Sequence, residues 1–160
     1  MNKLEQNTNN ATTWIGSFPG VSNDVSKGQT FTSPTEGEIQ TIEVFSSLVP
    51  EPGKVLLTLH NFDTETKTWG PSLGSSSVDF KKEDTGKWVA FNLPALRIIK
   101  GKTYGFKLEG NNSFVGIGEA AGSFKQPAFS SGQEWKFSGS NNQPDSFTYF
   151  SLAFKVGLRA

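Results

Sequence analysis

The sequence predicts an all-β fold, specifically an antiparallel two-sheet β-sandwich with jelly-roll topology. From Trp14 onward, Gly, Pro, Asn, Asp or Ser interrupts short apolar runs about every ten residues, a spacing typical of sandwiches and barrels. At least four of these runs alternate apolar and polar side chains with the period of two that marks a half-buried strand. No apolar stripe with the roughly 3.6-residue helical period is long enough for a helix. We therefore expect a chain that is nearly free of helix.

Chain length and a polar start predict one domain preceded by an arm. The 160 residues suit a single domain, which would bury about two-thirds of the surface that the unfolded chain exposes. Residues 1–13 are almost wholly polar, with four asparagines and three threonines, so we expect a flexible or partner-held arm there. Residues 14–160 would form the β-sandwich domain. The arm could support self-association by lying on a neighbouring molecule.

The sequence has no recognisable targeting segment. Residues 1–8 lack the basic start and apolar run that a secretory signal needs. We expect a protein that stays where it is made, travels without this signal, or is cut from a longer secreted precursor. No segment approaches the roughly 20 apolar residues of a membrane helix, so membrane insertion is not expected.

The candidate strands reveal which side chains face the core. Ile39, Ile42 and Val44 depart from strict alternation by one residue, which predicts a bulge near Gln40 or Thr41. Four later strands should each point one set of side chains inward: Val55, Leu57 and Leu59; Val89, Phe91 and Leu93; Tyr104, Phe106 and Leu108; and Phe150, Leu152, Phe154 and Val156. Two shorter strands are marked by Val115 with Ile117 and by Trp135 with Phe137.

The connections between these strands are short and rich in turn-forming residues. Residues 50–53 are expected to form a turn between two strands, and residues 63–66 and 84–86 to form hairpin turns. Residues 110–113 and 140–145 are expected to form longer polar loops. Parallel strands would need crossovers of about a dozen residues or more. The strands should therefore pair antiparallel.

Three strand-and-turn motifs follow one another between residues 29 and 106. They are Gln29-Thr30-Phe31-Thr32 with Gly37-Glu38-Ile39, then Thr85-Gly86-Lys87-Trp88-Val89-Ala90-Phe91, then Lys100-Gly101-Lys102-Thr103-Tyr104-Gly105-Phe106. Their order resembles that of small jelly-roll modules, galactose-binding-like in broad shape, which accompany bacterial surface and polysaccharide-degrading proteins. The resemblance covers roughly residues 29–156. It implies the fold more than any one function, and because ligand loops vary among such modules, it assigns no binding residue.

Composition excludes several classes of function. Fifteen basic and fifteen acidic side chains cancel, so no nucleic-acid partner is expected. The absence of cysteine excludes disulfides, thiolate metal sites and cysteine nucleophiles. A single histidine, His60, leaves no histidine-rich metal cluster.

No constellation predicts an enzyme, and no catalytic residue is assigned. His60 lies on an apolar strand without a Gly-x-Ser-x-Gly elbow elsewhere, so a serine hydrolase is not indicated. A glycosidase needs paired carboxylates. The closest pairs, Asp63 with Glu65 and Glu83 with Asp84, lie in predicted turns, where acidic side chains usually accept backbone amides or face water.

No cofactor is expected, although a structural calcium ion remains an alternative. Asn61, Asp63 and Glu65 occupy alternate positions, as ligands do in many calcium loops. They lack the glycine of the sharp turn and a downstream bidentate glutamate. A solvated hairpin is therefore favoured over a metal site.

Sugar recognition is the function that the remaining residues favour. Tryptophan offers a ring that stacks on the apolar face of a sugar, while amides and carboxylates bond its hydroxyls. Trp69 is the first candidate because its surroundings are turn-rich, and Trp88 is expected to face outward. Trp135 is expected in the core and Trp14 at an edge, and burial is the competing interpretation for every tryptophan. The candidate polar partners are Asn111, Asn112, Asn141, Asn142, Gln143 and Asp145.

Two classes of function remain open. The first, which we favour, is a non-catalytic module that binds a carbohydrate or glycoconjugate. The second is a structural or assembly subunit of a particle, fibre or surface complex, because capsid proteins and lectins share the jelly-roll architecture.

Overall fold

The computed structural model describes residues 2–17, 25–123, 125–138 and 144–159, and in these ranges the chain is built from strands. The strands are β1 (Asn2–Gln6), β2 (Ala11–Gly16), β3 (Val25–Thr32), β4 (Gly37–Glu51), β5 (Gly53–Asp63), β6 (Thr68–Phe80), β7 (Lys87–Ile98), β8 (Thr103–Asn111), β9 (Phe114–Ala121), β10 (Glu134–Ser138), β11 (Asp145–Phe147), β12 (Phe150–Leu152) and β13 (Phe154–Arg159). The only helical element in the described ranges is one 3₁₀ turn, η1 (Lys82–Asp84). No helix there is long and apolar enough to cross a membrane. The prediction of an all-β fold is confirmed.

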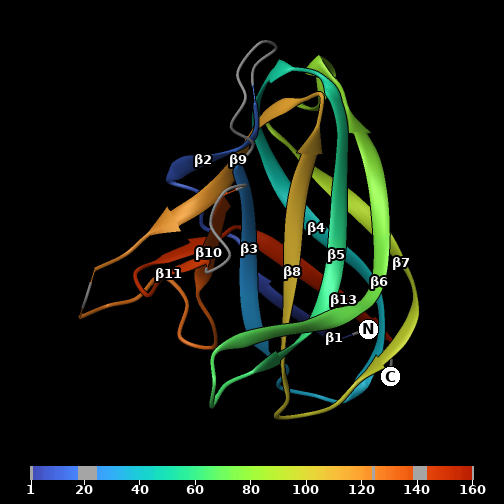
Figure 1. Ribbon diagram of the computed structural model, residues 1–160, viewed down its shortest axis with the longest axis vertical. Coiled ribbons are helices and arrows are strands. Elements are labelled where there is room, and N and C mark those ends of the chain that lie inside the picture. Colours follow the sequence, from blue (N-terminus) through green and yellow to red (C-terminus); the bar gives the residue numbers. More distant parts are fainter. Residues whose placement is uncertain (1, 18–24, 124, 139–143, 160) are drawn as a thin grey trace.

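The strands form a curled antiparallel sheet (Figure 1). Neighbours along it follow the order β1-β13-β4-β9-β2-β3-β8-β5-β6. Four pairings leave this path: β7 pairs with β4, β12 with β9, β10 with β3, and β11 with β10. Every pairing between described strands is antiparallel, as the short connections predicted. In Figure 1, β3, β8, β5 and β6 run across the front, and β4, β13 and β1 cross behind them.

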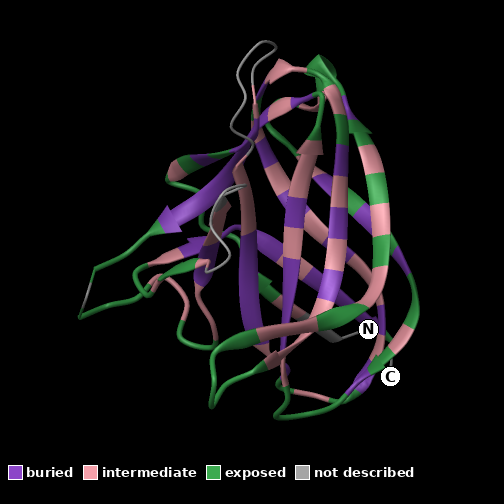
Figure 2. Ribbon diagram, in the orientation of Figure 1, coloured by how far each residue is buried: buried purple, intermediate pink, exposed green. Residues whose placement is uncertain are grey.

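The inner side of the curled sheet encloses a continuous apolar core. Side chains along β5 and β8 alternate between buried and less buried positions, which Figure 2 shows as bands of colour. Phe154 of β13 joins distant strands, because its ring centroid lies 6.0 Å from that of Phe31 on β3 and 5.5 Å from that of Phe106 on β8. The predicted inward sets on β5, β7 and β8 are confirmed, since no member is more than 8% exposed: Val55, Leu57, Leu59, Val89, Phe91, Leu93, Tyr104, Phe106 and Leu108.

The local predictions for β4 and the hairpins are largely confirmed. The register between β4 and β7 shifts between Ile39 and Thr41, where a bulge was expected. The predicted turns at residues 50–53 and 63–66 connect β4 to β5 and β5 to β6. The hairpin predicted at residues 84–86 is wrong, because β7 pairs with β4 rather than returning along β6. Here η1 redirects the chain, and the amide of Gly86 donates a hydrogen bond to the Ser46 carbonyl on β4 (2.7 Å).

The structure places residues 2–6 and 11–16 in the sheet and does not show the arm predicted over residues 1–13. β1 pairs with β13, and Leu4 lies opposite Val156 and packs against the core. Gln6 is buried, and its side-chain amide donates to the Leu152 carbonyl (3.2 Å). Polar composition concealed this strand, because backbone pairing and a few inward contacts are enough to hold a sheet edge.

Residues 150–156 were expected to form one strand, but they belong to two strands, β12 and β13. β12 pairs with β9, whereas β13 pairs with β4. Ala153 lies between them, and its amide donates to the Gly118 carbonyl on β9 (2.8 Å). As a result Phe150 is only half-buried, while Leu152, Phe154 and Val156 reach the core as predicted.

Phe154→Ala should lower the free energy of unfolding by about 3–5 kcal/mol, because it empties a fully buried site that contacts several other rings. Urea denaturation would measure the change. Tyr149→Ala is the control, since that ring is 40% exposed, and it should cost less than about 1 kcal/mol. Similar losses in the two variants would contradict the central place of Phe154 in the core.

Candidate ligand-binding groove

A groove of about 340 Å³ lies at the end of the sheet where β5 turns into β6. Three segments line it: the β5–β6 hairpin, the outer faces of β3 and β8, and the loop that precedes β10. Thr30 and Thr32 flank the fully buried Phe31, so their side chains lie on the face of β3 opposite the core. The lining residues are Thr30, Thr32, Phe62, Thr64, Lys67, Thr103, Ser130, Ser131, Gly132 and Gln133.

One wall of the groove is a backbone segment that adds to the edge of β3. The amide of Thr30 donates to the Gln133 carbonyl (3.0 Å), and the amide of Thr32 donates to the Ser131 carbonyl (2.8 Å). Between them, Gly132 approaches β3 so closely that a Cβ atom would lie 1.8 Å from the Thr30 carbonyl oxygen. Glycine is therefore required at this position for the wall to reach β3.

Three of the lining hydroxyls are held in place by hydrogen bonds. The hydroxyl of Thr30 accepts hydrogen bonds from the backbone amide of Gln133 (3.1 Å) and from the Trp135 indole (3.3 Å). The Thr32 and Thr103 hydroxyls bond each other across β3 and β8 (2.8 Å). The hydrogen bond between them uses the proton of only one hydroxyl, so the other hydroxyl can still donate its proton. The groove thus presents fixed groups that both donate and accept.

An aromatic cluster, made of Phe62, Trp69, Trp135 and Phe137, lies beside the groove. The ring of Trp69 meets Phe62, Trp135 and Phe137 edge-on at centroid distances of 5.8, 6.0 and 5.1 Å. It lies against Gly105 of β8, where a Cβ atom would come within 2.4 Å of the indole. Phe62 is the member of the aromatic cluster that also lines the groove, so Trp69 supports the groove from behind.

His60 ties the hairpin together beneath this cluster. Its Nδ1 lies 3.0 Å from the Gly70 carbonyl oxygen, and its Nε2 lies 2.7 Å from the Thr58 hydroxyl. A carbonyl oxygen can only accept, so Nδ1 carries the proton and the Thr58 hydroxyl donates to Nε2 in the neutral ring. Both ring nitrogens are engaged, which gives His60 a positioning role on β5 and β6.

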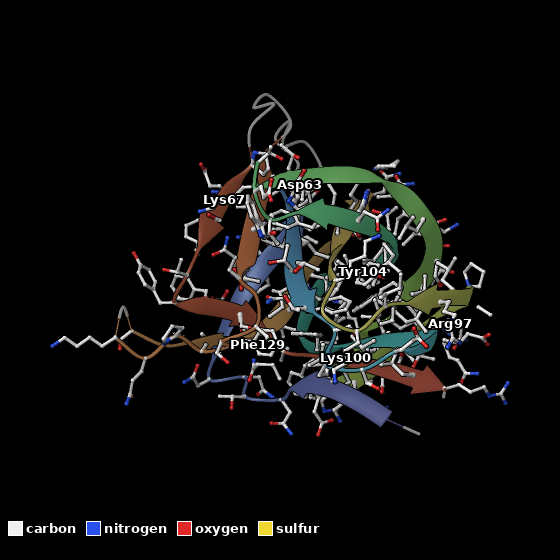
Figure 3. The ribbon with its side chains drawn as sticks, turned by 90° about the horizontal axis from the view of Figure 1, so that it is seen from below. Asp63, Lys67, Arg97, Lys100, Tyr104 and Phe129 are labelled. Carbon is white, nitrogen blue, oxygen red and sulfur yellow. The ribbon has the colours of Figure 1, made fainter. Side chains whose placement is uncertain are left out.

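Phe129 anchors the loop that supplies the opposite wall. Its ring packs edge-on against Phe154 of the core, with centroids 5.4 Å apart. Figure 3 looks onto this end of the curled sheet, with Phe129 and Tyr104 inside the ring of strands and Asp63 and Lys67 at its rim. Because Ser130 follows Phe129 directly, the position of the groove wall is tied to the core.

The structure separates the two tryptophans predicted to bind a ligand. Trp69 belongs to the aromatic cluster and is half-buried, but it does not line the groove. Trp88 lies on β7, edge-on to Phe45 at 5.4 Å, with the Lys155 Nζ atom 4.1 Å from its ring centroid. Trp135 is buried, as expected, and Trp14 is 36% exposed and stacks flat on Phe114.

The predicted polar partners are not gathered at the groove either. Asn111 and Asn112 lie at the turn from β8 to β9, eight residues and about 27 Å along β8 from Thr103. Asp145 is exposed on β11, opposite Lys136. Asn141, Asn142 and Gln143 lie outside the described residues.

The groove residues themselves carried only a weak signal in the sequence. Phe62 shares the outward face of β5 with Thr58 and His60, and an aromatic side chain on that face next to a hairpin is the feature that could have identified it. The threonines at 30 and 32 look like ordinary strand residues. Nothing in the sequence shows that residues 130–133 return to β3.

Asp63, the central carboxylate of the alternative calcium site, already accepts hydrogen bonds from the backbone. One oxygen of Asp63 accepts the backbone amides of Glu65 (2.9 Å) and Thr66 (3.2 Å), an Asx-type turn. These hydrogen bonds lower the pKa of Asp63. Within the described ranges, no group of three or more His, Asp or Glu side chains is placed to hold a metal ion.

A buried carboxyl pair lies on the inner side of the sheet, behind the groove wall. Glu119 of β9 and Glu134 of β10 are 8% and 2% exposed, and one oxygen of Glu134 has no hydrogen-bond partner. Burial, followed by the hydrogen bond to Glu119 and its charge, raises the pKa of Glu134 to about 9. Lys27 lies nearby, and burial lowers its pKa while the charge of Glu134 opposes that shift. The pair therefore holds a shared proton at neutral pH.

The groove combines one aromatic ring, several hydroxyls, an amide and a single ammonium group, a set suited to binding a polar ligand. Comparison with known protein families and with characterised proteins finds no match to this chain. Its function must therefore be argued from the chemistry of the groove.

Glu134→Gln should flatten the dependence of stability on pH. The folded-state pKa of about 9 exceeds the ordinary 4.5, so the contribution of protonated Glu134 is complete below pH 4.5 and is lost as pH rises through 9. Glutamine keeps a neutral donor at all pH values. Between about pH 5 and pH 9, urea titrations should show a fall on the order of 5 kcal/mol for the wild type and less than about 1 kcal/mol for the variant.

The charged groups that face Glu134, namely Glu119, Lys27 and Lys136, are retained in this variant, so the substitution removes the Glu134 carboxyl alone. Glu65→Gln is the matched control, because that side chain is exposed in the β5–β6 turn. Parallel pH profiles for Glu134→Gln and the wild type would contradict the shared proton.

Proposed function

We propose that this chain is a non-catalytic module that binds a carbohydrate or glycoconjugate in the groove beside Phe62. The observation that carries the proposal is the lining itself: six hydroxyl side chains and the Gln133 amide surround one aromatic ring. Sugars present the same combination in complementary form, with hydroxyls around an apolar C–H face. The groove volume of about 340 Å³ lies at the lower end of the range of small-ligand sites, which suits a short glycan segment.

The ring of Phe62 is well prepared for stacking. Trp69 packs edge-on against it at a centroid distance of 5.8 Å, and Trp135 packs at a tilt at 5.4 Å, so it loses little freedom on binding. Around it, the Thr64, Ser130 and Ser131 side chains are exposed and able to exchange water for sugar hydroxyls.

For the fold, we propose a two-sheet β-sandwich with jelly-roll topology, as in the galactose-binding-like modules that the sequence resembles. Ring contacts across the interior support two facing layers. Phe31 of β3 and Phe106 of β8 meet Phe154 of β13, and Phe80 of β6 lies 6.2 Å from Phe91 of β7. In such a sandwich, function depends on the loops and outer faces rather than on the core.

A second candidate function, a structural subunit of a particle, fibre or surface complex, is favoured by one observation. Trp14 and Leu48 lie on either side of Gly116 on neighbouring strands and are 36% and 48% exposed. Exposed apolar side chains that lie together are common where proteins associate. Sedimentation separates the candidates, since a monomer supports the binding module and a defined multimer supports assembly.

Phe62→Ala should weaken glycan binding by about tenfold or more, because it removes the stacking surface. A glycan array followed by calorimetry on the best oligosaccharide would measure the effect. Trp69→Ala and Trp88→Ala form a matched pair. The first should also weaken binding by releasing Phe62, while the second, on a separate face, should leave binding unchanged.

Absence of binding to every glycan on the array, together with sedimentation as a large closed assembly, would reject the proposal. Equal weakening by Trp69→Ala and Trp88→Ala would instead move the site away from the groove.

A further inference from the structure

We propose that the groove selects acidic sugars, carboxylated or sulfated, and that Lys67 binds the acidic group. This inference rests on the proposed function and specifies the class of glycan. Among the described lining residues Lys67 is the only charged side chain, and no carboxylate accompanies it. Of the other polar groups, the Thr64, Ser130 and Ser131 hydroxyls, the Gln133 side-chain amide and one hydroxyl of the Thr32–Thr103 pair can donate hydrogen bonds to an anion.

The backbone of Lys67 is held in position by its turn. It adopts a left-handed conformation with φ of 56°, which is uncommon for a residue with a side chain. Asp63 fixes the start of this turn through the amides of Glu65 and Thr66, and the Thr66 and Thr68 hydroxyls bond each other on either side of Lys67 (2.7 Å). A flexible ammonium is therefore carried on a fixed point at the rim of the groove.

The ammonium of Lys67 remains available for a ligand. In the chain segments that the structure describes, the ion pairs are Arg97 with Glu36 and Lys107 with Glu109, and neither includes Lys67. An ammonium bonded to a carboxylate or sulfate gives a stronger hydrogen bond than one between neutral groups.

Charges of both signs lie at this end of the molecule, outside the lining of the groove. Lys100 and Lys102 lie in the turn between β7 and β8, at the same end of the molecule as the β5–β6 hairpin (Figure 1), and the Lys102 ammonium lies 5.5 Å from the Tyr104 ring centroid. Of the acidic side chains nearby, Glu36 is paired with Arg97 at 2.7 Å. Asp63 directs one oxygen into its own turn but keeps its charge, so Asp63 and Glu65 are the opposing charges on the hairpin.

The proposal is tested with pairs of oligosaccharides, one with its acidic groups intact and the other with those groups esterified or removed. Oligogalacturonate is compared with its methyl ester, and κ-carrageenan oligosaccharide with its desulfated form, so that the two arms distinguish a carboxylate from a sulfate. Calorimetry should give about fivefold tighter binding for at least one acidic form, and raising NaCl from about 0.05 M to about 0.5 M should remove most of that advantage.

Lys67→Gln should abolish the advantage of the acidic form and change the affinity for its neutral partner less than about twofold. Lys87→Gln is the matched control, because Lys87 is exposed at the start of β7 and does not line the groove. An advantage that persists in Lys67→Gln, or is lost equally in Lys87→Gln, would overturn the proposal.

Failure of this inference and failure of the proposed function give different results. If neutral glycans bind with a Phe62-dependent affinity and neither acidic form binds better, the preference for acidic sugars is wrong and the binding module stands. If no glycan of either kind binds, the proposed function is wrong and this inference falls with it.

Discussion

The packing around Phe154 is the interaction on which the rest of the structure depends. Its ring contacts Phe31 and Phe106 on one side of the curled sheet, and it receives Phe129 from the loop that leads to the groove wall. Each contact joins segments far apart in the sequence, so no local hairpin can replace it. Dispersion and apolar burial act only at close range, so Phe129 must lie against Phe154 to be stabilised. Residues 130–133 follow Phe129 directly, and this contact therefore also sets their position.

The groove follows from that closure by strand geometry. Once Phe31 and Tyr104 are fixed in the core, their neighbours Thr30, Thr32 and Thr103 must lie on the outer face, where two hydroxyls bond each other. Outward positions on β3 and β8 also include Gly28 and Gly105, and the missing side chains make room for the indole of Trp69. The residues that are buried in the core thus determine which side chains lie together on the outer face of the sheet.

The alternation of apolar and polar residues predicted the core but not the groove. The period of two identified the inward sets of β5, β7 and β8, and one skipped residue located the bulge beside Ile39. The same rule could not show that β7 joins β4, because pairing between distant strands depends on long-range packing. It also could not predict that residues 130–133 reach β3. Nor could it predict that Phe62 lines the groove and Trp69 packs behind it, since both are outward aromatic residues.

Alternation predicts burial but not polarity, and β9 shows the difference. Its inward series runs from Val115 and Ile117 to Glu119, which is as buried as a core residue yet carries a carboxyl group. Glu134 meets it from β10, and the cost of burying two carboxyls is reduced because one of them keeps its proton. The next residue, Trp135, lies on the opposite face and donates to Thr30 in the groove. One short strand therefore carries both a buried carboxyl of the interior and the indole that donates to the groove wall.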